Sequence, residues 1–364
     1  MSLDVHFTSS LLNPSSSTSR VFGREVSSYN QLVSSKAGYD SAVISLKVNK
    51  NDMVDLAQWL IGREVAVYID TLQIWTGIVN QVDFSNPAAN LTVGPYLDIV
   101  NRVLVSYTDY STGVPGITTY ANDTPSQSRY GILTKILNGG SISSTNAGKI
   151  RNRFLFENRY PKINKSISTI SDISFTINCI GHYYLLDTYL YNNSASGSTT
   201  LSTKIKSILA ANPNSSFSID YNNIETNTLS VGTTENNNRV ASDIIKELIS
   251  LGDDTTDNKV VFGLYGRKAS YKTVVNTVEY YLDIAAKQIN ISNKTGRVIN
   301  PWEIKPGYFV EILSTLPYSS KLVESSTISL IDSISYTYPY EFQISSGDSG
   351  TLSQQLAKLG ISGL

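Results

Sequence analysis

The sequence predicts a β-rich α+β protein, and three observations lead to this fold class. Charged residues make up only 16% of the 364 residues, while Ser, Thr, Asn and Tyr are abundant. These residue types favour strands, turns and hydrogen-bonded loops over long surface helices. Alternating apolar residues recur along the chain, and short segments with apolar residues at helical spacing interrupt them.

Residues 1–110 are expected to form mainly strands around one helix. The segment AVISLKV (42–48) alternates like a half-buried strand, and NDMVDLAQWLIG (51–62) has helical spacing, a capping residue and a terminal glycine. The stretch 72–107 predicts a strand, a turn, a second strand, a corner at Gly94–Pro95 and a third strand. One helix inserted into a series of strands suggests a barrel that the helix plugs or flanks.

Residues 111–260 are expected to form a mixed α/β middle region. Apolar spacing and stop signals predict helices at 126–140, 145–160, 201–212 and 239–251, and strands at 173–181 and 183–191. The segments around Gly94 and Gly181, 87 residues apart, both combine a strand, a glycine, an aromatic residue and another strand. This echo is either an internal duplication or a coincidence between two strand–turn–strand units.

Residues 261–345 return to strands and are expected to form a second β domain, with a turn at Pro306–Gly307. Residues 346–364 are expected to be a linker and a short helix with Leu352, Leu356 and Leu359 on one stripe. This helix is too short to be stable alone, so it should dock on this chain or on a neighbour.

The formal net charge of −1 provides no overall field that would steer nucleic acid or an anionic membrane to the protein. A local basic cluster of Lys149, Arg151, Arg153 and Arg159 could meet phosphate, but a solvated or interface helix face is the simpler interpretation. The single cysteine, Cys179, excludes an intrachain disulfide and a cysteine-based zinc site, and its apolar surroundings predict a buried, inert thiol. No transmembrane helix, membrane anchor or signal peptide is expected.

Two motifs resemble sites of chemistry without their required partners. The string SGDSG (346–350) resembles the surroundings of a serine nucleophile, but only His6 and His182 are available as a base. His6 lies in an expected floppy terminus and His182 at an expected strand corner. The acidic loop GDDTTDN (252–258) lacks the spacing of a calcium loop, so a capped helix end is the simpler interpretation. Paired carboxylates for glycoside hydrolysis stay open, because their separation is spatial. We therefore predict no catalytic, cofactor-binding or metal-ligating residues and no enzymatic activity.

The order of short motifs resembles that of the tail hub and minor tail proteins of tailed bacteriophages. The motifs that carry this resemblance lie at 75–79 (WTGIV), 93–97 (VGPYL), 101–107 (NRVLVSY), 128–132 (SRYGI), 146–161, 180–183 (IGHY), 241–253 and 305–310 (KPGYFV). Each is a degenerate pattern of strands and corners, and together they cover about residues 40–345.

The resemblance implies two tail-tube-like β-barrel domains, at 1–110 and 261–345, separated by the mixed region. It implies a homo-oligomer, with a trimer favoured and a hexameric ring possible, in the virion tail. The implied partners are tail tube, distal tail and tip, spike or fibre proteins, and DNA would pass through the lumen without sequence-specific binding.

The main alternative is a virion protein that binds or cleaves carbohydrate on the host surface. Exposed tryptophans and paired acids on one sheet face would mark this function, but Trp59 and Trp75 fit core or sheet positions, leaving only Trp302. A secreted adhesin is a further alternative that the missing signal peptide disfavours.

Overall fold

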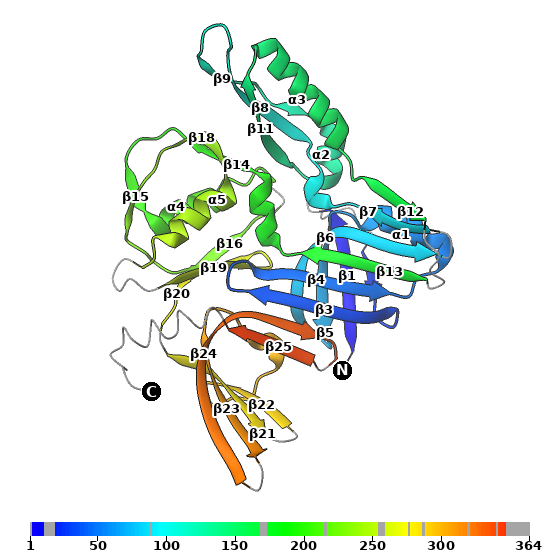
Figure 1. Ribbon diagram of the computed structural model, residues 1–364, viewed down its shortest axis with the longest axis vertical. Coiled ribbons are helices and arrows are strands. Elements are labelled where there is room, and N and C mark those ends of the chain that lie inside the picture. Colours follow the sequence, from blue (N-terminus) through cyan, green and yellow to red (C-terminus); the bar gives the residue numbers. More distant parts are fainter. Residues whose placement is uncertain are drawn as a thin grey trace.

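The computed structural model confirms the β-rich α+β class and describes most of the chain. It describes residues 2–10, 19–86, 89–167, 173–214, 217–253, 259–275, 277–285, 288–318, 321–339 and 341–346. Figure 1 shows an elongated molecule in which a central sheet is flanked by three other parts. These are an upper lobe around α3, a lobe around α4 and α5, and a lower sheet that includes β21–β24.

Three sequence-based predictions lie wholly or partly outside the described residues. They are the C-terminal helix with Leu352, Leu356 and Leu359, positions 347–350 of the SGDSG string, and positions 254–258 of the acidic loop.

The central sheet is antiparallel and joins strands that are far apart in sequence. Its strands pair in the order β2-β1-β5-β6-β13-β4-β3, and β7 and then β12 extend it beside the far end of β6. The strand bounds are β1 (Leu3–Ser10), β2 (Arg20–Phe22), β3 (Val26–Ser34), β4 (Gly38–Leu46), β5 (Arg63–Ile69), β6 (Leu72–Asn86), β7 (Ala89–Val93), β12 (Ile163–Ile167) and β13 (Ser174–Ile180). No pairing among the described strands joins β1 to β3, so the closed barrel expected here is not confirmed.

The core of the central sheet is built from alternating residues and one helix. Val82 and Phe84 of β6 are buried and lie two positions apart, so they share one face of the strand, whereas residues 74–79, which include Trp75 and Ile78, are buried on both faces. The helix α1 (Met53–Leu60), preceded by the 3-10 turn η1 (Lys50–Asp52), buries Met53, Leu56, Ala57 and Leu60. The helix predicted from spacing is therefore confirmed.

The lower sheet is connected to the central sheet by one long strand. The first half of β24 (Lys321–Thr337) pairs with β23 (Phe309–Tyr318), and its second half pairs with β3 and with β25 (Glu341–Ser346). The strand β21 (Val278–Ala285) lies between β22 (Gln288–Asn293) and β23, and the 3-10 turn η4 (Pro301–Glu303) precedes β23. The pairings of these described strands also form an open series, so the second closed barrel is likewise not confirmed.

The upper lobe contains a correction to the predicted elements. A single helix was expected at 126–140, but α2 (Thr124–Tyr130) ends at Gly131, and residues Thr134–Ser141 form the strand β11. Gly131 has a φ of 89°, which ends the helix, and β11 then pairs in parallel with β8. The other elements of this lobe are η2 (Tyr96–Asp98), β8 (Arg102–Thr108), β9 (Pro115–Ile117), β10 (Ala121–Asn122) and α3 (Ser144–Asn158).

The lobe around α4 and α5 contains a second correction. Residues 183–191 were expected to be a strand, but the 3-10 helix η3 (His182–Thr188) occupies most of this segment. The helices α4 (Leu201–Ala210) and α5 (Ala241–Ser250) follow the prediction, although Leu251 is exposed. The strands of this lobe are β14 (Leu190–Asn193), β15 (Ser198–Thr200), β16 (Asp220–Ile224), β17 (Ser230–Gly232), β18 (Glu235–Val240), β19 (Val260–Tyr265) and β20 (Lys268–Thr273).

The echo around Gly94 and Gly181 has a structural counterpart. A strand of the central sheet ends before each glycine, a 3-10 helix follows, and another strand begins after it. The units diverge beyond this point, because the predicted helix around 133–138 is a strand whereas 201–210 is a helix. A duplication stays a prediction.

Candidate assembly surface

The strand β12 is an outer edge of the central sheet and is exposed along its whole length. Among the described strands it pairs only with β7, through the antiparallel register Ile163↔Val93 to Ile167↔Ala89. All five of its residues are exposed. The opposite side of β12 therefore presents backbone N–H and C=O groups that another strand can pair with.

Two isoleucines make this edge apolar as well as unpaired. The relative exposure is 54% for Ile163 and 90% for Ile167. Alternation along the strand places both side chains on the same face as Lys165. A single lysine opposes pairing with another strand only weakly. The strand β12 therefore combines free backbone hydrogen-bonding groups with exposed apolar area.

The helix α3 leads directly into this edge and buries little of its own surface. Ser143 caps its start, with the hydroxyl accepting from the Asn146 N–H at 3.3 Å. Ala147 is the only residue of α3 classed as buried, while Phe156 is 67% exposed and Ile150 is 41% exposed. A helix that packs through so small a stripe leaves most of its circumference available for contacts.

The chain between α3 and β12 adds an aromatic and cationic group to the same surface. The Arg159 guanidinium lies 4.4 Å from the Phe156 ring centre and 5.5 Å from the Tyr160 ring centre, and it pairs with Asp123 at 3.0 Å. Aromatic and arginine side chains of this kind are enriched in protein interfaces. We call Phe156, Tyr160, Ile163, Lys165 and Ile167 the assembly surface.

The basic cluster predicted on α3 is largely satisfied within the chain. Arg151 donates to the Thr119 carbonyl at 2.7 Å, and Arg153 pairs with Glu157 at 2.8 Å. Arg159 is held by Asp123, as described above, and Lys149 is exposed. These contacts match the simpler interpretation of a helix face better than a phosphate-binding patch.

The two histidines lie in settings that differ from the predictions. His6 was expected in a floppy terminus, but it lies on β1 opposite Ala66 of β5, and its ring lies 4.6 Å from that of Tyr68. The terminus is ordered because β1 supplies Val5 and Phe7 to the core. His182 begins η3 rather than a strand corner, and it is completely buried.

His182 belongs to a buried polar cluster that joins three parts of the fold. Its Nε2 lies 3.0 Å from Oε1 of Glu64 on β5, and its ring stacks on Phe217 at 5.1 Å. Arg267 donates to both carboxylate oxygens of Glu64, at 3.1 and 2.7 Å. Burial alone would raise the pKa of Glu64, but hydrogen bonds from His182 and Arg267 outweigh burial and lower its pKa to about 2. The cluster fastens β5 to η3 and to the turn between β19 and β20.

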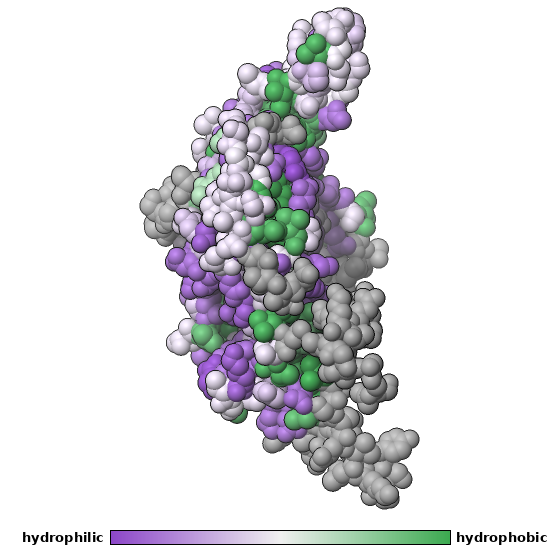
Figure 2. Space-filling model, turned by 90° about the vertical axis from the view of Figure 1, so that its left-hand side faces the viewer, coloured by the Kyte–Doolittle hydropathy of each residue, from purple (hydrophilic) through white to green (hydrophobic). Residues whose placement is uncertain are grey.

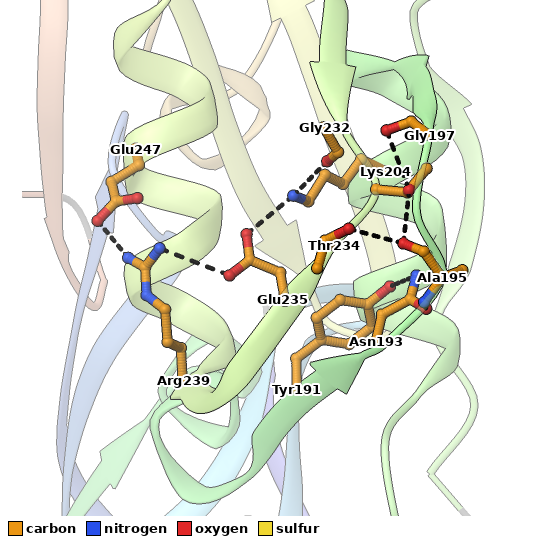
Figure 3. A network of polar contacts seen from close by, with 11 residues as sticks. Tyr191, Asn193, Ala195, Gly197, Lys204, Gly232, Thr234, Glu235, Arg239 and Glu247 are labelled. Atoms are coloured by element: carbon orange, nitrogen blue, oxygen red, sulfur yellow. Dashed lines mark hydrogen bonds and ion pairs between the residues drawn. The ribbon is translucent and has the colours of Figure 1, made fainter.

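A second polar network lies inside the lobe of α4 and α5 and is shown in Figure 3. Lys204 of α4 donates to Glu235 of β18 at 2.8 Å and to the Gly232 carbonyl at 2.7 Å. Arg239 of β18 then bridges Glu235 and Glu247 of α5. Each charge in this network meets an opposite charge, so the arrangement joins α4, β18 and α5.

The remaining candidate residues are buried or engaged. Cys179 is buried in β13, and burial raises the pKa of its thiol, which keeps it protonated as the sequence analysis expected. Trp75 is completely buried, the Arg63 guanidinium covers the ring of partly buried Trp59 at 3.8 Å, and Trp302 packs edge-on against Tyr336.

Within the described ranges, no group of three or more His, Cys, Asp and Glu side chains is placed to hold a metal ion. No helix in the described part of the chain is both long and apolar enough to span a bilayer.

Comparison with known proteins gives likenesses of shape but not of sequence. No protein-family model and no curated protein sequence matches the chain. Solved structures of similar shape include three that are covered over most of their length. They are a tail protein from Neisseria meningitidis (7% identity, 92% of this chain and 91% of that chain, TM-score 0.40), a prophage tail protein from Listeria monocytogenes (11%, 98% and 99%, 0.40) and a 43 kDa prophage tail protein from Shewanella oneidensis (8%, 94% and 95%, 0.43).

All three similar chains are described as tail proteins. Their TM-scores lie below the range in which two chains are taken to share a fold. Nothing about the chemistry or the partners of this chain follows from them.

Sequence reasoning missed the assembly surface as a functional region. Residues 163–167 (INKSI) place Ile163 and Ile167 on the same strand face as Lys165, and this mixed face does not mark the segment as an exposed edge. The exposure of both faces depends on β12 lying outermost beside β7, a pairing between segments about 70 residues apart that has no local signal.

Proposed function

We propose that this chain is a structural protein of a bacteriophage tail that acts by assembly. In this proposal it forms the hub or tail-tip ring, continues the tail tube, connects the tube to tip, spike or fibre proteins and leaves a channel for DNA. The observation that carries the proposal is the edge strand β12, which is exposed on both faces and carries Ile167 at 90% exposure. The order of motifs in the sequence, which resembles that of tail hub proteins, supports the hub as the place of this chain in the tail.

An exposed apolar strand edge promotes unwanted association in a monomeric protein, but in an assembly it can form the contact between subunits. A strand with free N–H and C=O groups tends to pair with another chain, and monomeric proteins usually shorten, charge or cover such an edge. Pairing β12 with an edge of the next subunit would satisfy these groups and bury the isoleucines. A closed ring repeats this contact without leaving a free end, and a trimer is favoured over a hexamer.

The shape of the molecule suits such a ring. Figure 1 shows β12 beside β7 below the upper lobe and β22 in the lower sheet, so these two strands lie well apart in the molecule. Figure 2 shows hydrophobic and polar residues mixed along a narrow molecule, with no single dominant apolar face in that view. In this proposal the open strand series at 1–110 and 261–345 become tail-tube-like barrels within the assembled ring, and β13 completes the first of them.

Passage of DNA would require a continuous channel rather than a strongly charged surface. The chain carries 29 basic and 30 acidic residues, so a ring of copies has nearly balanced charge. The overall balance does not fix the charge of the lumen, but a lumen without a dense basic lining would bind the phosphate backbone weakly and let the duplex pass, because affinity for DNA comes largely from phosphate contacts. The proposal therefore requires neither catalysis nor sequence-specific DNA binding.

Light scattering with a variant of the edge tests the proposal. The wild-type mass should rise with concentration to a multiple of the 39.9 kDa chain. Ile167→Lys places a charge in the contact and should weaken association by about tenfold or more, since desolvating an unpaired charge is costly. Val298→Lys is the matched control, because Val298 is 74% exposed and lies outside the assembly surface.

Two results would contradict the proposal. One is a monomer at every concentration. The other is equal association of the Ile167→Lys protein and the wild type. Binding or cleavage of capsule or cell-wall carbohydrate by the monomer would instead favour the carbohydrate-directed alternative.

A further inference from the structure

A polar hollow on the face of the β16–β20–β19 sheet is separate from the assembly surface. Its volume is about 420 Å³, and its lining includes Lys268, Lys272 and Lys305. Ligand pockets of similar size are usually mostly apolar, with a few polar groups. The concentration of lysines here therefore indicates a charged ligand rather than an apolar one.

The floor of the hollow follows from the alternation of β20. Ala269 and Tyr271 point into the core and are buried, so Lys268, Ser270 and Lys272 share the opposite face. Lys268 and Lys272 are four residues apart on this face, and Ser270 lies between them. The floor thus presents a row of cationic and hydroxyl groups.

The wall of the hollow comes from the turn before β23 and depends on one glycine. Gly307 has a φ of 86°, and a Cβ at this position would lie 2.8 Å from Val261 of β19. The absence of a side chain lets the turn lie directly on the sheet. The Gly307 N–H donates to the Ile331 carbonyl at 2.8 Å, which holds the wall in place.

Two tyrosines brace the lysines. The Lys272 ammonium donates to the Tyr308 hydroxyl at 3.0 Å and lies 4.2 Å from the centre of that ring. The Lys305 ammonium lies 5.3 Å from the centre of the Tyr265 ring. These contacts position the two cations without neutralising them, because an aromatic ring carries no net charge.

The charges of the hollow are unbalanced. Among the described residues, Lys268, Lys272 and Lys305 form no ion pair with a carboxylate. The single acid of the lining, Glu225, accepts a hydrogen bond from the Thr273 N–H at 3.0 Å. Three ammonium groups thus face one carboxylate.

We infer that this hollow binds a small ligand that carries two or more oxyanion groups, either phosphates or carboxylates. Ammonium groups recognise both as point charges, so the geometry defines the charge of the ligand and leaves the choice of oxyanion to experiment. The serine and asparagine side chains of the lining would accept or donate further hydrogen bonds to such a ligand. This site is independent of ring formation and of the proposed function.

Calorimetric titration of the full chain with pyrophosphate and with citrate, at matched ionic strength, tests the inference. We expect at least one of them to bind, and the double variant Lys272→Gln/Lys305→Gln to weaken that binding at least tenfold. Binding of pyrophosphate alone would assign the ligand to phosphates, and binding of citrate alone would assign it to polycarboxylates. The control Lys149→Gln, on α3 in another lobe, should bind as the wild type does.

A second variant separates binding from folding. Tyr308→Phe removes the hydroxyl that positions Lys272 and keeps the ring, so it should fold normally and weaken binding severalfold. The inference is overturned if neither anion binds the wild type, or if the folded lysine variants bind as tightly as the wild type.

Discussion

Glu64 shows how a single residue can fasten separate segments of this fold. Its carboxylate accepts hydrogen bonds from Arg267 at 3.1 and 2.7 Å, and it lies 3.0 Å from Nε2 of His182. His182 and Arg267 lie 118 and 203 positions from Glu64 in the sequence, so the contacts close long loops of the chain. A carboxylate in such a position contributes stability only while it is ionised.

The stability of the protein should therefore decline in acid through Glu64. The partners lower its pKa from 4.5 to about 2, so its contribution is complete above about pH 4.5 and is lost as pH falls toward 2. A shift of this size corresponds to roughly 3 kcal/mol. Urea unfolding between pH 7 and pH 2.5 should show the wild type losing stability faster than Glu64→Gln, which is less stable at pH 7.

An exposed carboxylate provides the control for this prediction. Glu157 pairs with Arg153 on α3, but both side chains are more than half exposed. Exposed pairs contribute about 0–1 kcal/mol, so Glu157→Gln should follow the wild-type pH profile closely. Parallel profiles for the wild type and Glu64→Gln would show that Glu64 does not fasten the fold.

At the scale of elements, the connection from β13 to η3 depends on the absence of a side chain. A Cβ on Gly181 would lie 1.6 Å from the Tyr39 carbonyl oxygen, an approach that backbone atoms cannot relieve easily. The Gly181 N–H also donates to the Asp40 carbonyl at 2.7 Å, which fixes the connection against β4. The glycine thus lets η3 begin directly beside the central sheet.

Replacement of Gly181 by alanine should be strongly destabilising. The clash must displace β4 or η3, and we expect a loss of at least about 3 kcal/mol, as for other strained or overpacked sites. The matched control is Gly148→Ala in the middle of α3, where a Cβ would meet nothing within 4 Å. That variant should gain about 0.5–1 kcal/mol from helix propensity. Thermal unfolding of both variants measures the difference, and a near-neutral Gly181→Ala would contradict the geometry of this connection.

The elements with a clear local period were predictable from sequence, and those decided by distant pairing were not. The spacing of Val240, Ile244, Leu248 and Leu251 predicted α5, and the alternation in residues 42–48 predicted β4. Ile136 and Leu137 fit a helical pattern equally well, but pairing with β8 makes them part of β11. Tertiary contacts override weak local propensity in short segments of this kind.

The candidate sites were less predictable than the fold, because each is assembled from distant segments. The alternation of Lys268, Ser270 and Lys272 is visible in the sequence, but the wall at Lys305 and Tyr308 is not placed beside it by any local signal. The exposure of Ile167 likewise depends on which strand lies outermost. Sequence patterns show which residues share a face, and only the fold shows what that face meets.

For the molecule as a whole, we propose assembly through the edges of its sheets. The central sheet ends in the exposed strand β12. The lower sheet is joined to the central sheet by β24, which pairs with both β23 and β3. Such a molecule has several surfaces that face different directions, which suits a subunit that contacts copies of itself and neighbouring proteins above and below.

Single-particle electron microscopy of the purified, concentrated protein would show whether copies of the chain assemble through β12. We expect closed rings with rotational symmetry, a trimer in the favoured case, a central channel, and β12 at the contact between subunits. Particles that are only monomeric, or rings in which β12 faces solvent, would contradict this proposal.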